Sequence, residues 1–142
     1  MRRFHSYGPV DLRYHFGVER RELVERCVAQ LLGEEDEGGH FFTIWAPRQA
    51  GKTWLMRRAI EEICARHGER FLVGTFSMGS TAMDDNEPEN AFFARVPRLF
   101  DLAFDRQIEA PTTWSDWMEL FRPGGGVFDR PVILLIDEFD DL

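Results

Sequence analysis

The chain has 142 residues, of which 44% are hydrophobic, and this is enough apolar material for the core of one globular domain. Asp and Glu number 25 against 17 Lys and Arg, so the formal net charge is -8, which excludes a general attraction for nucleic acid. No apolar run approaches the roughly 18 residues of a membrane span, and the basic start is not followed by the apolar stretch of a signal peptide. We therefore expect a cytoplasmic protein that has neither a membrane nor a nucleic-acid partner.

Two amphipathic helices are predicted in the first half of the chain. Residues 20–32 carry apolar side chains at spacings of three and four, and Gly33 is suited to end that helix. Residues 55–64 carry a second stripe of the same kind. Cys27 and Cys64 each lie within one of these stripes, so we expect both to be buried rather than paired in a disulfide or bound to a metal.

Three apolar runs predict strands. HFFTIW at 40–45 is continuous, as in strands that are covered on both faces, RFLVGTFSM at 70–78 is the second, and PVILLI at 131–136 is the third. Helices alternate with these runs along the chain. The alternation predicts an α/β fold with a parallel sheet in three layers.

Two aromatic helices are predicted between the second and third strands. The first covers residues 92–103 and contains Pro97, which is expected to kink it. The second begins after Thr113, a suitable N-cap, and its apolar face favours a place in the core over a ligand cage. That face consists of Trp114, Trp117, Met118 and Phe121.

The stretch APRQAGKT at 46–53 matches the phosphate-loop pattern G-x-x-x-x-G-K-[ST] except at its first position. It follows a predicted strand and opens a predicted helix, so backbone N–H groups and the helix dipole point to the same place. Gly51 lets the backbone curl around a phosphate, Lys52 supplies a cation to the β and γ phosphates, and the Thr53 hydroxyl can ligate Mg²⁺. We expect ATP and Mg²⁺ to bind at Ala46, Pro47, Arg48, Gln49, Ala50, Gly51, Lys52, Thr53 and Trp54.

An acidic pair follows the third predicted strand, in the sequence VILLIDEFDDL. Beside a phosphate loop, Asp137 is suited to join Thr53 in the Mg²⁺ shell. Glu138 is suited to orient and deprotonate the water that attacks the γ phosphate. We therefore predict Asp137 as a metal ligand, and Glu138 and Lys52 as catalytic residues.

The segments VERREL, APRQAGKTWLM and PVILLIDEFDDL together resemble the AAA-like ATPases of the STAND signalling group and their archaeal and origin-recognition-like relatives. The resemblance extends from about Tyr7 to Leu142. It implies a nucleotide-proximal segment at 1–19, in which Gly8, Pro9 and Val10 lie near the adenine. It also implies an α/β core at 20–142, which ends with the Walker B strand, that is, PVILLI and the acidic pair after it. It also implies protein partners or self-assembly through regions beyond this chain.

The resemblance further implies a strand that follows Walker B in sequence and lies between the strands at 40–45 and 131–136. That strand, the sensor residues, the arginine finger and the helical lid are expected beyond Leu142. We therefore expect residues 1–142 to be the N-terminal part of a single ATPase domain, inactive in isolation. PVILLI should pair with RFLVGTF. HFFTIW and PVILLI should either be separated by the width of one strand or pair with each other in an arrangement that the family does not have.

Two other functions compete with an ATP-hydrolysing regulatory module. The first is a non-catalytic scaffold that binds ATP only to stabilise an assembly. The second is a phosphate-loop kinase, which is disfavoured because Glu138 directly after the metal Asp suits water activation and because no arginine-rich lid follows.

Overall fold

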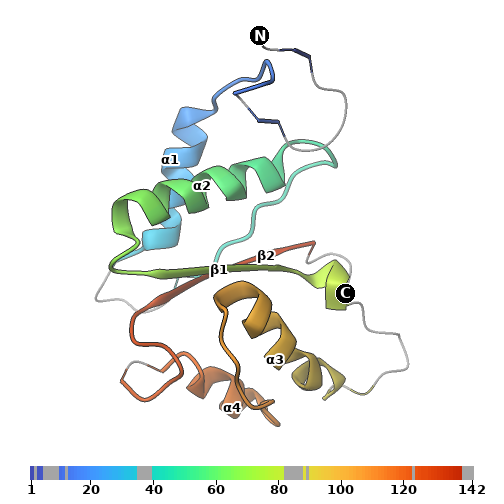
Figure 1. Cartoon of the computed structure of the whole chain (residues 1–142), viewed down its shortest axis with the longest axis vertical. Coiled ribbons are helices and arrows are strands. Elements are labelled where there is room, and N and C mark those ends of the chain that lie inside the picture. The colour runs from blue at the N-terminus through green and yellow to red at the C-terminus, as the bar shows by residue number, and fades with distance from the viewer. Residues whose placement is uncertain are drawn as a thin grey trace. The chain divides into compact units, whose positions relative to one another are not determined.

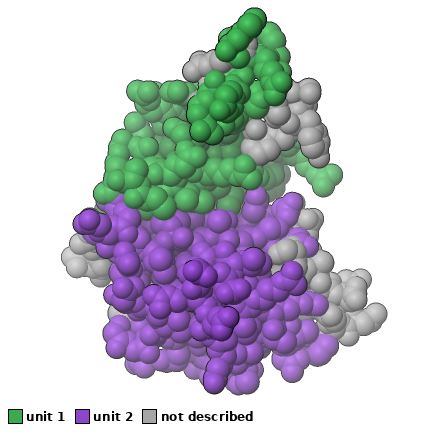
Figure 2. Space-filling view, in the orientation of Figure 1, with its two compact units in different colours: residues 1–66 green, residues 67–142 purple. Residues whose placement is uncertain are grey.

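The protein is a mixed α/β chain (Figure 1). The computed structural model describes residues 1, 3–4, 10–11, 13–34, 40–81, 88, 90–122 and 124–138. They form two compact units, unit 1 at residues 1–66 and unit 2 at residues 67–142 (Figure 2). Among the described residues, no helix combines the length and the apolar character that crossing a bilayer requires. The elements are α1 at Arg21–Leu32, α2 at Lys52–His67, β1 at Leu72–Ser77, the 3₁₀ helix η1 at Met78–Thr81, α3 at Ala91–Phe104, α4 at Trp114–Glu119 and β2 at Val132–Asp137.

Unit 1 contains the two predicted amphipathic helices. In α1 the buried residues are Val24, Cys27 and Val28, and burial raises the pKa of the Cys27 thiol. Gly33 ends the helix at a φ of 58°, and its N–H donates to the carbonyl of Ala29 at 3.1 Å. Glycine suits this position because a positive φ brings no clash when the residue has no Cβ. The predicted helix and its end are confirmed.

The stripe of α2 is confirmed for most of its length, but the prediction for Cys64 is wrong. Cys64 is exposed, whereas Leu55, Ala59 and Ile63 are buried. Cys64 lies one turn beyond Ile60, which is only half-buried. Cys64 therefore lies at the edge of the apolar stripe. The apolar pattern of the sequence includes this residue in the buried face, although its side chain is exposed.

Residues 40–45 do not form a strand, which contradicts the prediction for HFFTIW. Phe41 and Trp45 are 94% and 88% exposed. A strand needs a neighbour to satisfy its backbone N–H and C=O groups, and none of the described residues pairs with this segment. The apolar side chains are therefore not enough to make it part of a sheet.

The sheet of unit 2 consists of β1 and β2, which run parallel with Leu72 opposite Val132 and Ser77 opposite Asp137. The predicted pairing of PVILLI with RFLVGTF is confirmed. Within the described residues the sheet has these two strands, which is fewer than the predicted three-layer core requires.

Helix α3 packs against β1 and carries the core of unit 2 (Figure 1). Its residues Phe93, Val96 and Phe100 are buried together with Phe128, and Phe100 is 0% exposed. The helix runs continuously through Pro97. From α4 and the turn after it, Trp117 and Phe121 pack against this cluster, whereas Trp114 and Met118 are 53% and 64% exposed. The predicted place in the core is therefore confirmed for Trp117 and Phe121 and is wrong for Trp114 and Met118.

Thr113 caps α4 as predicted. Its hydroxyl accepts the N–H of Asp116 at 3.1 Å, and the Asp116 carboxylate accepts the N–H of Thr113 at 3.0 Å. This reciprocal pair satisfies two backbone donors at the start of the helix. Hydrogen bonds from Thr112 and Thr113 lower the pKa of Asp116.

Candidate functional site

The predicted phosphate loop has a backbone shape that suits an anion. Gln49 has a φ of 61° and Gly51 a φ of 90°, so left-handed residues flank Ala50. Alternation of left- and right-handed residues turns N–H groups toward a common concavity in backbone anion sites. In this loop the N–H of Ala50 donates to the carbonyl of Pro47 at 3.2 Å. Only glycine adopts a φ of 90° without strain, and this accounts for Gly51 at the sixth position of the motif.

The loop leads directly into α2, which begins at Lys52. The first bond into this helix runs from the N–H of Leu55 to the carbonyl of Gly51 at 2.9 Å. The N-terminus of a helix presents backbone N–H groups, and the helix dipole makes this end attractive to negative charge. Thr53 is exposed and Trp54 half-buried in this first turn.

The Lys52 ammonium lies across the loop itself. Its Nζ donates to the carbonyl oxygen of Ala46 at 2.8 Å, which joins the seventh position of the motif to the first. The side chain therefore closes the loop as a tether. A bound phosphate would compete with this carbonyl for the ammonium. The interaction also gives Ala46 a role that depends on its backbone alone, so a methyl group is compatible with the first position.

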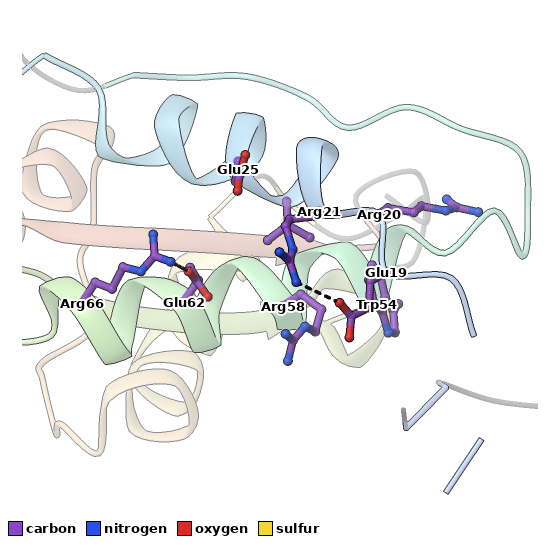
Figure 3. Close-up of a pocket in the computed structure, with 9 residues that line it drawn as sticks. Glu19, Arg20, Arg21, Glu25, Trp54, Arg58, Glu62 and Arg66 are labelled. Atoms are coloured by element: carbon purple, nitrogen blue, oxygen red, sulfur yellow. Dashed lines mark hydrogen bonds and ion pairs between the residues drawn. The ribbon is translucent and has the colours of Figure 1, made fainter. Parts of the chain in front are cut away.

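A polar groove of about 360 Å³ lies next to the loop, between α1 and α2 (Figure 3). Trp54 forms part of its wall. Four arginines and three glutamates contribute the charged lining, and several of them pair: Arg21 contacts Glu19 at 3.4 Å, and Arg66 contacts Glu62. The groove-lining residues are Glu19, Arg20, Arg21, Val24, Glu25, Trp54, Arg58, Glu62 and Arg66.

Arg20 joins this groove to the loop, a contact that the sequence did not predict. Its Nη1 donates to the carbonyl of Ala50 at 2.8 Å across 30 residues of chain. Of the proposed adenine segment, Gly8 and Pro9 lie outside the described residues, and Val10 is half-buried. In the loop, Pro47 and Arg48 are exposed.

The acidic pair lies at the end of the sheet in unit 2. Asp137 is the last residue of β2, and Glu138 follows it with a left-handed φ of 56°. The Ser77 hydroxyl donates to the Glu138 carboxylate, and the N–H of Glu138 donates to Asp137 Oδ1 at 3.0 Å. Positive φ at a residue with a long side chain costs conformational energy and is frequent at functional sites.

Parallel pairing explains why Ser77 meets this pair. Ser77 ends β1 opposite Asp137, and the carboxyl ends of parallel strands share one edge of the sheet. A Cβ on Gly79 would lie 2.8 Å from Glu138 Oε2, so the small residue leaves room for the carboxylate. Sequence reasoning missed Ser77, although a polar residue that ends a neighbouring parallel strand was the available signal.

The two predicted Mg²⁺ ligands belong to different units, Thr53 to unit 1 and Asp137 to unit 2. Within the part of the chain that the structure describes, no group of three or more His, Cys, Asp or Glu side chains is arranged to hold a metal ion.

A scan against models of known families, a search of curated proteins and a search of solved structures found no match to this chain.

Proposed function

We propose that the protein binds Mg²⁺-ATP at residues 46–53 and hydrolyses it as the nucleotide-binding part of an AAA-like regulatory ATPase of the STAND type. The observation that carries the proposal is the backbone of the loop. Left-handed residues at Gln49 and Gly51 stand directly before the helix that begins at Lys52. A concavity of N–H groups, a helix N-terminus and a lysine together fit a polyphosphate. The three-layer phosphate-loop core belongs to the same proposal.

The roles of the residues follow from their chemistry. The loop N–H groups hold the phosphates, and Lys52 exchanges the Ala46 carbonyl for phosphate oxygens. Thr53 and Asp137 supply oxygen ligands for Mg²⁺, which when bound neutralises charge on the β and γ phosphates. Glu138 accepts a proton from the attacking water.

Ser77 adds a step to this scheme. The Glu138 carboxylate accepts a hydrogen bond from the Ser77 hydroxyl, so the base is held at the edge of the sheet. A general base must lie within hydrogen-bond reach of the proton it takes. In our proposal Glu138 therefore gives up or shares its bond to Ser77 when it engages water.

The binding proposal is tested by titrating the protein with Mg²⁺-ATP by calorimetry. Lys52→Ala removes the one lysine of the motif, and loss of a charge-assisted contact predicts affinity weaker by about 10- to 150-fold. Arg57→Ala removes an exposed cation from the same helix and serves as the matched control, with unchanged affinity expected. Equal affinity in the parent protein and in Lys52→Ala would remove the loop from the proposal.

Hydrolysis is tested separately by phosphate release from a longer protein that includes the elements expected beyond Leu142, because the 142-residue chain alone is expected to be inactive. Glu138→Gln keeps the shape of the side chain but not the proton acceptor, so ATP binding should persist while turnover falls by about 100-fold or more. Asp137→Ala should instead weaken the dependence on Mg²⁺. Binding without any phosphate release by a longer protein, one that carries the strand, sensor residues and arginine finger expected beyond Leu142, would favour the non-catalytic scaffold. Transfer to an added acceptor would favour a kinase.

A further inference from the structure

Arg20 lies outside the loop at residues 46–53 in sequence and forms a hydrogen bond to the backbone of that loop. It directly precedes α1, and its guanidinium reaches the carbonyl of Ala50 at 2.8 Å. Figure 3 shows the side chain extending away from the start of α1. The Cβ that Gly51 lacks would lie 3.6 Å from the same Nη1 atom, so the guanidinium is in contact with the most constrained part of the loop.

The geometry of a peptide bond gives this contact a consequence. The carbonyl of Ala50 and the N–H of Gly51 belong to one planar unit, and in a trans peptide they point in opposite directions. None of the peptide bonds in the described residues is cis. A guanidinium that fixes the Ala50 oxygen on one side therefore fixes the Gly51 N–H toward the other side.

We infer that Arg20 is a positioning residue for nucleotide binding, which fixes the Ala50–Gly51 peptide so that the Gly51 N–H faces the phosphate. The inference rests on the proposed function of the loop. Arg20 would act through the loop backbone and not by touching the nucleotide. Fixing this peptide before binding removes part of the conformational cost that the ligand would otherwise have to offset.

The other arginines of the groove have different partners, which separates Arg20 from a general basic patch. Arg21 pairs with Glu19, and Arg66 pairs with Glu62 one turn away on α2. Arg58 pairs with Glu61. These pairs are exposed or, at Glu62, partly exposed, and pairs of this kind contribute little to stability. Arg20 instead bonds a backbone carbonyl 30 residues along the chain.

The test uses one assay without nucleotide and one with it. Trypsin cleaves after Arg48, which is exposed in the loop. Without nucleotide, Arg20→Ala should speed cleavage at Arg48 several-fold, because cleavage requires the loop to open locally. With Mg²⁺-ATP, the same variant should bind roughly three- to tenfold more weakly, as expected for loss of one exposed charged hydrogen bond.

Two further variants make the result specific. Arg20→Lys retains one donor on a long stem and should recover part of both effects, although it cannot reproduce the planar fork. Arg21→Ala removes the neighbouring charge and its pair with Glu19, and should leave both readouts at the parent level.

Parent values for Arg20→Ala in both assays, or equal effects from Arg21→Ala, would overturn the inference. If the parent protein binds no Mg²⁺-ATP, the proposed function fails. The cleavage assay then still decides whether Arg20 holds the loop. The two failures are therefore distinguishable.

Discussion

Two apolar runs of six residues meet different fates in the two units. PVILLI in unit 2 becomes β2, with β1 beside it and an apolar cluster packed on the same sheet, whereas HFFTIW in unit 1 forms no strand and exposes Phe41 and Trp45. The two runs are similarly apolar, so composition does not separate them. A run becomes a strand when a neighbour accepts its backbone hydrogen bonds, and only one of these two has such a neighbour among the described residues.

The two regions that carry the predicted site residues differ in how far they depend on long-range contacts. The loop of unit 1 combines local features, namely positive φ at Gln49 and Gly51 and the start of a helix at Lys52, with one long-range contact from Arg20 to Ala50. The acidic end of unit 2 depends on long-range pairing, because Ser77 meets Glu138 across 61 residues. Damage to the core should therefore disturb the second region more than the first.

The largest expected contrast is between two phenylalanines. Phe100→Ala empties a fully buried position in unit 2 and should lower the free energy of unfolding by about 3–5 kcal/mol. Phe41→Ala removes an exposed ring from unit 1 and should change it by less than about 0.5 kcal/mol. Urea titration followed by far-UV circular dichroism measures both. A large cost for Phe41→Ala would mean that HFFTIW packs in solution, and the contrast between the two runs would disappear.

The next contrast concerns space at the sheet. Gly74 in β1 is buried, and a Cβ there would clash with the ring of Phe104. Gly74→Ala should therefore cost about 1–3 kcal/mol through overpacking. Gly125→Ala is the matched control, because the nearest atom to its Cβ is Arg122 Cδ at 3.9 Å. The same urea titration applies, and equal stability of the two variants would show that Phe104 moves aside freely.

A smaller effect is expected at the start of α4. Thr113→Ala removes the hydroxyl that caps the helix and should cost about 1 kcal/mol. Ser115→Ala changes an exposed residue of the same helix and should be neutral or slightly stabilising, since alanine favours helices. Thermal unfolding of both variants compares them. A shift for Ser115→Ala as large as that for Thr113→Ala would remove capping as the cause.

The smallest expected effect is the pH dependence of stability that arises from one carboxylate in each unit, Asp11 and Asp116. Hydrogen bonds from the Arg13 side chain and backbone lower the pKa of Asp11 from 3.8 to about 2, and hydrogen bonds from Thr112 and Thr113 lower that of Asp116. A lowered pKa means that the ionised form is favoured in the folded state. Each contribution to stability is therefore present above the unfolded pKa and lost as the pH falls through the folded one, between about pH 4 and 2 for Asp11.

The causes separate these two carboxylates. By NMR titration, Arg13→Ala should return the pKa of Asp11 toward 3.8 and leave Asp116 unchanged, and Thr112→Ala should do the reverse. If Asp11 already titrates near 3.8 in the parent protein, its ion pair with Arg13 does not persist in solution.

Elements with local causes could be predicted from the amino-acid sequence. The stripes of α1 and α2, the termination at Gly33, the cap at Thr113 and the start of a helix at the phosphate-loop motif all follow from spacings of a few residues. The positive φ at Gly51 agrees with the glycine of the motif, whereas the bond from Arg20 to Ala50 is long-range. The assignment of Mg²⁺-ATP to that loop stays a prediction.

Folding in three dimensions settles which apolar runs pair, which aromatic residues are covered and which residues contact the predicted site residues. It left HFFTIW without a strand partner among the described residues, exposed Trp114 and brought Ser77 to Glu138 and Arg20 to Ala50. Periodicity reports that a residue can be buried or paired, but not what lies opposite it. These outcomes depend on contacts between residues far apart in sequence, and such contacts form only when the chain is folded.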